Sequence, residues 1–198
     1  MDSVAKSANS SSPVDANILF VLGGPGAGKG TQGVRLAEEL PLVHLSVGDL
    51  MRAERERCSP DISSLIEKCM REGIVVPPEV VMKVVKMAIV RHVEEGRKNF
   101  FVDNFPRDMQ QALEFEEQIC PCRAALYFEC SEETMLRRLL IRGRTSGRVD
   151  DNEVTFGKRM KDFKERTIPV VERLKESNKL IVVRRIPPCA PQNHPRLC

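Results

Sequence analysis

The fold of this chain is decided by the stretch Gly23-Gly24-Pro25-Gly26-Ala27-Gly28-Lys29-Gly30-Thr31. It follows an apolar run at 18–22 of the length of a buried strand, and it precedes residues 31–40, whose apolar positions have helical period. Glycines let backbone amides wrap around an anion, and a helix N-terminus adds positive potential. The stretch therefore predicts a phosphate-binding loop between a strand and a helix.

The lysine of this loop is placed to reach the β- and γ-phosphates of a nucleotide. The motif departs from the strict phosphate-loop pattern because Gly30, not Ser or Thr, follows the lysine. The sequence also lacks the Asn-Lys-x-Asp motif with which a GTPase reads guanine. The loop alone would also fit a motor ATPase, so at this point it predicts only a nucleotide-binding site, with Gly26, Ala27, Gly28, Lys29, Gly30 and Thr31 as the residues that bind the phosphates of the nucleotide.

Further short apolar runs lie at 100–102, 124–128 and 180–183, with long segments of helical period between them. One such segment carries a stripe from Val80 to Val93, which we interpret as core. Ser131 is a candidate cap for the helix that follows it. Strands alternating with helices predict an α/β fold with a parallel sheet covered by helices on both faces.

Composition excludes several classes of protein. The 198 residues are 41% hydrophobic and 30% charged, which is ordinary for a soluble domain. Against 31 Lys and Arg stand 28 Asp and Glu, so the net charge of +3 argues against a nucleic-acid binder, and no apolar run could cross a membrane. His44, His92 and His194 do not cluster with other ligand types, so each is expected to be a surface or packing residue rather than a metal ligand. Seven cysteines, an odd number, predict reduced thiols in a cytoplasmic protein, with nuclear presence as a further expectation. Residues 1–16 are predicted to be a disordered tail.

Four further segments match one family pattern in the right order: 45–52 (LSVGDLMR), 72–77 (EGIVVP), 103–107 (DNFPR) and 142–152 (RGRTSGRVDDN). With the phosphate loop they resemble the nucleoside monophosphate kinases, most closely the eukaryotic UMP-CMP (uridylate) kinases and next the short-lid adenylate kinases. The resemblance implies a P-loop NTPase fold with a five-stranded parallel sheet. The implied kinase domain spans 17–183, with a monophosphate-binding insert at 46–76 and a short lid at 143–152.

The activity implied by this resemblance is in-line phosphoryl transfer from ATP to UMP or CMP, with Mg²⁺ held through water near Asp103. Such a transfer needs many cations around the phosphates, and guanidinium groups bind phosphate with two parallel hydrogen bonds. The implied catalytic residues are Lys29, Asp103, Arg107, Arg142, Arg148 and Arg159, of which Arg142 also contacts ATP. The implied monophosphate-binding residues are Arg52, Ile74, Val75, Val76, Asn104, Phe105, Pro106, Arg107, Gln111, Arg148 and Arg159. A monomer is expected, with ATP and a nucleoside monophosphate as its partners and neither nucleic acid nor membrane among them.

Two positions bear on the base of the monophosphate. Val47 stands where adenylate kinases usually carry Thr and UMP-CMP kinases Ala, and the missing hydroxyl favours a pyrimidine. Gln111 is expected to face the base, and its amide could read uracil, cytosine or adenine. Adenylate kinase activity (AMP + ATP = 2 ADP) therefore stays open as the alternative.

The chain departs from the family at two places. Asn104 stands where the family normally has Gly, and Asn tolerates left-handed backbone angles better than most residues. Residues 184–198 form a divergent, proline-rich tail where the family has an adenine-contacting loop and a final helix. This departure raises a second alternative, a nucleotide-binding but catalytically weak isoform that lacks the final helix. Asp150 and Asp151 are candidates to fasten the lid.

Overall fold

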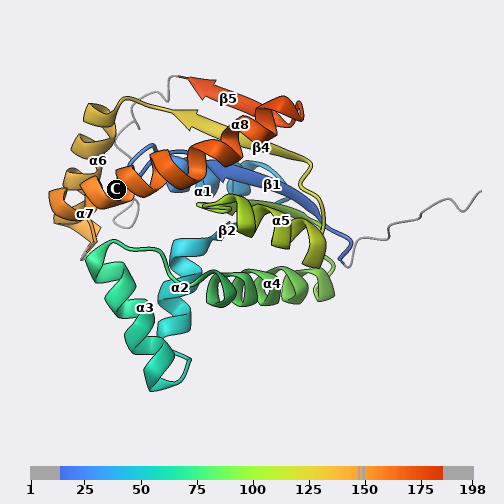
Figure 1. Ribbon diagram of the computed structural model, residues 1–198. Coiled ribbons are helices and arrows are strands. Elements are labelled where there is room, and N and C mark those ends of the chain that lie inside the picture. Colours follow the sequence, from blue (N-terminus) through green and yellow to red (C-terminus); the bar gives the residue numbers. More distant parts are fainter. Residues whose placement is uncertain (1–13, 147, 149, 185–198) are drawn as a thin grey trace, which may run out of the picture.

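The computed structural model describes residues 14–146, 148 and 150–184. They form a five-stranded sheet in the order β2-β3-β1-β4-β5, in which every neighbouring pair is parallel (Figure 1). This confirms the predicted P-loop NTPase fold class. The strands are β1 (Asn17–Leu22), β2 (Val43–Ser46), β3 (Asn99–Asp103), β4 (Ala124–Glu129) and β5 (Leu180–Arg184).

Helices surround the sheet on both faces. They are α1 (Lys29–Glu39), α2 (Val47–Arg55), α3 (Pro60–Glu72), α4 (Pro78–Glu94), α5 (Met109–Gln118), α6 (Glu132–Ser146), α7 (Glu153–Asp162) and α8 (Ile168–Glu176), with a π-helical segment η1 (Phe163–Thr167) between the last two. Buried apolar side chains form two hydrophobic cores, one on each face of the sheet. Alternate residues of β1 pack into different cores because side chains alternate across a strand. Ile18, Phe20 and Leu22 pack with α4, α5 and α8, whereas Val21 packs with α6 and α7.

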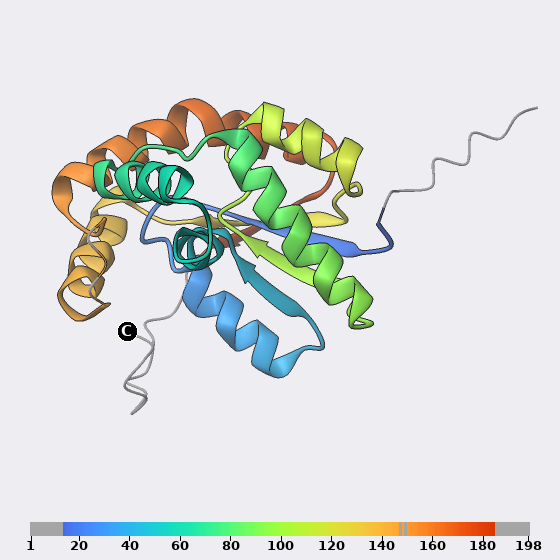
Figure 2. The ribbon, with the colours of Figure 1, turned by 90° about the horizontal axis from the view of Figure 1, so that it is seen from below.

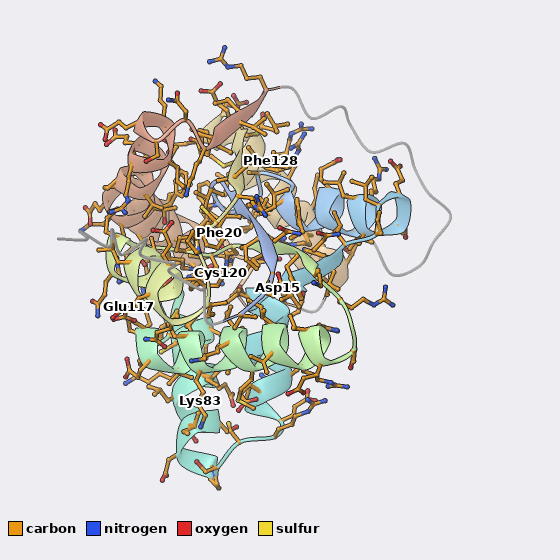
Figure 3. The ribbon with its side chains drawn as sticks, turned by 90° about the vertical axis from the view of Figure 1, so that its right-hand side faces the viewer. Asp15, Phe20, Lys83, Glu117, Cys120 and Phe128 are labelled. Atoms are coloured by element: carbon orange, nitrogen blue, oxygen red, sulfur yellow. The ribbon has the colours of Figure 1, made fainter. Side chains whose placement is uncertain are left out.

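The larger core has an aromatic centre. The ring of Phe20 meets the rings of Phe115 and Phe105 edge-on, with centroids 5.0 and 5.9 Å apart. Phe20 lies inside the body while Lys83 points outward from α4 (Figure 3). The predicted stripe on α4 is core as expected, with Val81 and Val85 buried. Helices α4 and α5 lie side by side beneath the sheet (Figure 2).

Capping side chains fix where several helices begin. Ser46 accepts from the amide of Asp49 at the start of α2, and Asp108 accepts from the amide of Gln111 at the start of α5. The predicted cap of α6 is present, since the Ser131 hydroxyl accepts from the amide of Thr134 at 3.4 Å. These caps hold the ends of strands and helices around one edge of the sheet.

The predicted segments relate to the elements as follows. The insert at 46–76 contains α2 and α3, which project from the sheet as an arm (Figure 1). Helix α6 extends through Ser146, so the first four residues of the predicted lid are helical. The folded chain begins earlier than predicted, because the Val14 amide donates to the Ile119 carbonyl and Ala16 packs on the core. Residues 1–13, 147, 149 and 185–198, which hold most of the predicted tails, lie outside the described residues.

Within the described part of the chain, no helix combines the length and hydropathy needed to cross a bilayer. The same residues contain no group of three His, Cys, Asp or Glu side chains suited to hold a metal ion. The cysteines that the structure describes are free thiols: Cys58, Cys69, Cys120, Cys122 and Cys130. The structure therefore offers no disulfide or metal cluster in these ranges as a source of stability.

Candidate active site

A cavity of about 580 Å³ opens at the carboxyl ends of the central strands. The phosphate loop follows β1, while Ser46 ends β2 and Asp103 ends β3. In an open parallel sheet this is the edge at which ligands bind. The cavity is lined by the loop, by the arm of α2 and α3, by residues 103–111 and by the ends of α6 and α7.

The phosphate loop is held in a shape that only small residues allow. Gly26 has a φ of 84°, and a Cβ at this position would lie 2.2 Å from the carbonyl oxygen of Met135. The Lys29 ammonium donates to the carbonyls of Gly23 and Gly24 at 2.8 and 3.0 Å. Burial lowers the pKa of Lys29 to about 8. The loop thus presents a partly desolvated cation at the N-terminus of α1.

All five arginines expected in the site line the cavity: Arg52, Arg107, Arg142, Arg148 and Arg159. Arg142 forms a bidentate pair with Asp151, with N···O distances of 2.6 and 2.7 Å. Arg159 donates to Asp150 at 3.0 Å. Burial alone would lower the pKa of Arg142, but the hydrogen bonds to Asp151 together with the charges of Asp151, Asp150 and Asp103 leave this pKa raised. Asp150 and Asp151 thus form ion pairs with two of the arginines of the cavity.

A third carboxylate, Asp49, joins the arm to the lid side of the cavity. It pairs with Arg52 in its own helix, and the Arg148 guanidinium lies 3.3 Å from its Oδ1. Burial alone would raise the pKa of Asp49, but hydrogen bonds from Ser46 and Arg52 leave it lowered. Asp49 was not among the expected site residues, although its position three residues before Arg52 on a helix is a signal that could have predicted this pair.

Arg107 differs from the other four arginines. Among the described residues, no carboxylate oxygen lies within 4.0 Å of its guanidinium. Burial, and next the nearby charge of Arg159, lower its pKa to about 10, so it remains a cation at neutral pH. A guanidinium placed in this way favours binding of an external anion such as a phosphate.

One carboxylate oxygen of Asp103 has no hydrogen-bond partner among the described residues. This oxygen, Oδ1, is buried, and Oδ2 lies 3.8 Å from His44 Nε2. A carboxylate oxygen of this kind fits a water molecule bound to Mg²⁺, which prefers oxygen ligands and retains several waters. His44 was expected to be a surface or packing residue. It does pack, edge-on to Phe101, and it also lines the cavity.

Val47 and Gln111, the two residues expected to bear on the base, both line the cavity and are buried. The Gln111 Oε1 accepts from the amide of Arg107 at 2.9 Å, whereas its Nε2 has no partner among the described residues. Asn104 adopts a φ of 65°, the left-handed conformation for which Asn is suited, and its amide donates to the Val21 carbonyl. The amide nitrogen of Gln111 is therefore free to donate to a ligand.

The structure brings nearly all the expected site residues to one cavity. Two side chains lie elsewhere: Ala27 and Phe105 are fully buried in the two cores. Pro106 lines a smaller cavity of about 40 Å³ that it shares with Arg107 and Arg159. The remaining expected residues line the main cavity: Gly26, Gly28, Lys29, Gly30, Thr31, Arg52, Ile74, Val75, Val76, Asp103, Asn104, Arg107, Gln111, Arg142, Arg148 and Arg159.

A phosphate loop that faces a cluster of arginines across one cavity defines a nucleotide phosphotransferase of the P-loop class. Residues 21–179 match the family model described as adenylate kinase, and the chain belongs to this family of nucleoside monophosphate kinases. It is 45% identical over 173 residues to a uridylate kinase of Saccharomyces cerevisiae, covering 87% of this chain and 85% of the relative.

Relatives with other names are equally similar. The chain is 45% identical over 168 residues to adenylate kinase 1 of Schistosoma mansoni, covering 85% of this chain and 84% of the relative. It is 44% identical over 175 residues to a UMP-CMP kinase of Lentinula edodes, covering 84% and 77%. The comparisons therefore establish the class of enzyme, and both pyrimidine and adenine nucleotides appear in the names of its relatives.

Proposed function

We propose that this kinase phosphorylates pyrimidine nucleoside monophosphates: UMP or CMP + ATP = UDP or CDP + ADP. The observation that carries the proposal is Val47, a buried apolar side chain in the wall of the cavity. A hydroxyl at this place could hydrogen-bond to adenine, and valine offers none. The uridylate kinase and UMP-CMP kinase relatives support the same assignment.

The transfer needs alignment and neutralisation of charge more than a dedicated base. An oxygen of the monophosphate attacks the γ-phosphorus of ATP, a new P–O bond forms, and ADP leaves with the electrons of the broken bond. Arg52 and Arg107 hold the phosphate of the acceptor. The transferring group is stabilised by Lys29, Arg142, Arg148 and Arg159.

Mg²⁺ belongs to this proposal because the residues present fit it. The unpartnered Oδ1 of Asp103 would hold the ion through water. When bound, the ion neutralises charge on the β- and γ-phosphates of ATP. The loop glycines leave the backbone close to those phosphates, and a Cβ at Gly30 would meet only Asp103, at 3.5 Å.

The test is a coupled assay with ATP and UMP, CMP or AMP as acceptors. We expect kcat/KM to be highest for UMP or CMP. In Val47→Thr we expect kcat/KM for AMP to rise about fivefold, the effect of one added hydrogen bond. Val182→Thr, on β5 and partly exposed, is the matched control. AMP as the best acceptor of the wild-type protein would replace the proposal with adenylate kinase activity.

The second candidate is adenylate kinase activity itself, favoured by the Schistosoma relative and by a Gln111 amide that could also read adenine. The third outcome is a protein that binds ATP but transfers phosphate poorly to every acceptor. The divergent, proline-rich residues 184–198 favour this outcome, because the resemblance implies an adenine-contacting loop and a final helix at this place.

A further inference from the structure

The π-helical segment η1 makes direct contacts with the residues around Arg107. The Thr167 hydroxyl donates to the Arg107 carbonyl at 2.8 Å. The neighbouring Arg166 pairs with Asp108, with an N···O distance of 2.5 Å. Single π-helical turns are rare and occur often at functional sites. In this π-helical turn, the successive side chains of Arg166 and Thr167 contact the successive residues Asp108 and Arg107.

The same two residues are also held from the other side by Gln111. The Arg107 amide donates to Gln111 Oε1 at 2.9 Å, and Asp108 accepts from the Gln111 amide at 2.8 Å. Arg107 is thus fixed through both of its peptide groups. Because Gln111 Oε1 is occupied by this hydrogen bond, the orientation of the amide is set, and Nε2 is the atom left without a partner.

The helix that precedes η1 also contributes a side chain to the cavity. Helix α7 carries Arg159, which pairs with Asp150 at the cavity. The chain runs from α7 through η1 into α8 with no intervening loop. A shift of this continuous helical segment would therefore move Arg159 and the contacts to Arg107 and Asp108 together.

We propose that Thr167 and Arg166 are positioning residues of the monophosphate site, acting through Arg107 and Gln111. The Thr167 hydroxyl fixes the backbone of Arg107 and thereby the position of its guanidinium. Arg166 fixes the side chain of Asp108, which caps α5 and thereby orients Gln111. Neither side chain touches the acceptor. The proposal rests on the monophosphate site described above but not on which base the site prefers. Its test therefore uses whichever acceptor the wild-type protein phosphorylates best.

The decisive comparison is between Thr167→Val and Thr167→Ser. Valine keeps the shape and removes the donor, and we expect KM for the monophosphate to rise about three- to tenfold, the range for one lost hydrogen bond to a partly buried group. KM for ATP should stay within about twofold because the contacts lie on the acceptor side. Serine retains the hydroxyl and should restore the wild-type KM. Ser177→Ala, which removes a 2.8 Å hydroxyl–carbonyl hydrogen bond from the end of α8, is the matched control.

A second readout measures binding of the monophosphate alone, by calorimetry without ATP, so that it does not depend on turnover. Thr167→Val should weaken this binding by the same factor as it raises KM. Arg166→Met should weaken it by about two- to threefold, and less at high salt because Arg166 is part-exposed. Equal increases in KM for both substrates, or a serine variant as impaired as the valine variant, would overturn the proposal. So would unchanged monophosphate affinity in a folded Thr167→Val protein. A wild-type protein that prefers AMP would overturn only the pyrimidine assignment.

Discussion

The Nε2 of His44 lies 3.8 Å from Oδ2 of Asp103, and its ring occupies the space beside Gly33. A Cβ at Gly33 would lie 2.5 Å from this Nε2 and 2.8 Å from two ring carbons. The absence of a side chain on α1 is therefore what allows the imidazole to approach the carboxylate at the end of β3.

The first prediction compares two glycines in helices. Gly33→Ala should destabilise the protein by about 1–2 kcal/mol, because a close contact with the largely buried His44 ring outweighs the higher helix propensity of alanine. Gly157→Ala, on α7, meets nothing within 4 Å and should stabilise by ~0.5–1 kcal/mol. Urea unfolding of both variants gives the comparison. Adding His44→Ala to Gly33→Ala should recover part of the loss, and strict additivity of the two would contradict the contact.

A second prediction concerns Arg107, the arginine without a carboxylate partner among the described residues. Arg107→Met should lower kcat/KM about a hundredfold or more, as loss of a phosphate-binding donor does. It should not lower the melting temperature of the nucleotide-free protein, because no ion pair is broken. A clear drop in that temperature would show that the guanidinium has a structural role.

The contrasting variant is Arg142→Met. It removes the bidentate partner of Asp151, whose side chain is fully buried, and leaves Arg159 at 3.6 Å as the nearest cation. We expect a loss of about 2–3 kcal/mol in the free energy of unfolding, less than the about 3–5 kcal/mol for breaking a fully buried ion pair, because Arg142 is 30% exposed. Chemical denaturation without nucleotide measures this. Asp151→Asn should show a similar loss, and stability equal to wild type in both would contradict the assignment.

A third prediction concerns pH. The pKa of Lys29 is lowered from 10.5 to about 8 in the nucleotide-free protein, so between these values the unfolded chain binds the extra proton and the folded one does not. Its unfavourable contribution to stability is therefore full below pH 8 and is relieved as the pH rises through this window.

If Lys29 binds the phosphates of ATP as proposed, its charged form is the form that binds, so ATP affinity should fall as the pH rises above 8. Binding at about pH 9 should then take up protons. Calorimetry in two buffers of different ionisation enthalpy measures the uptake. Lys29→Met should abolish it, and an equal uptake in that variant would assign the proton to another group.

A fourth prediction follows from the left-handed backbone of Asn104, with its φ of 65°. Asn104→Gly should leave kcat unchanged or raise it, since glycine adopts this conformation without strain. Asn104→Val should destabilise by ~1–2 kcal/mol, because a β-branched residue strongly disfavours positive φ. Steady-state kinetics and thermal melting separate the two effects. A tenfold loss of kcat in the glycine variant would show that the asparagine side chain itself takes part.

Apolar runs were enough to predict β1, β3, β4 and β5, each within about a residue at either end. Strand β2 was harder because His44 interrupts its short apolar run, although the resemblance to a five-stranded family implied it. The phosphate loop and the five arginines were found because glycine spacing and ordered motifs are local signals.

What the sequence could not reveal are contacts between distant segments. The approach of Arg166 to Asp108 joins residues 58 positions apart, and that of Lys158 to the Glu72 carbonyl joins residues 86 apart. No local pattern encodes such pairs, because they depend on how α7, η1 and α8 pack against the sheet. The π-helical turn has no signature of its own either. The approach of His44 to Asp103 depends on Gly33, eleven positions earlier in the chain, because the imidazole occupies the space that a side chain there would fill.

The pairing of arginines with Asp49, Asp150 and Asp151 has a consequence for the turnover cycle. If these arginines bind phosphate as proposed, the carboxylates pair with the same guanidinium groups that the product must release, and they would compete with the product for them. Four of the arginines have a partner ready when the product dissociates, which lowers the free energy of the empty site relative to the product complex. In kinases whose rate is limited by product release, such competition favours rapid departure over tight retention.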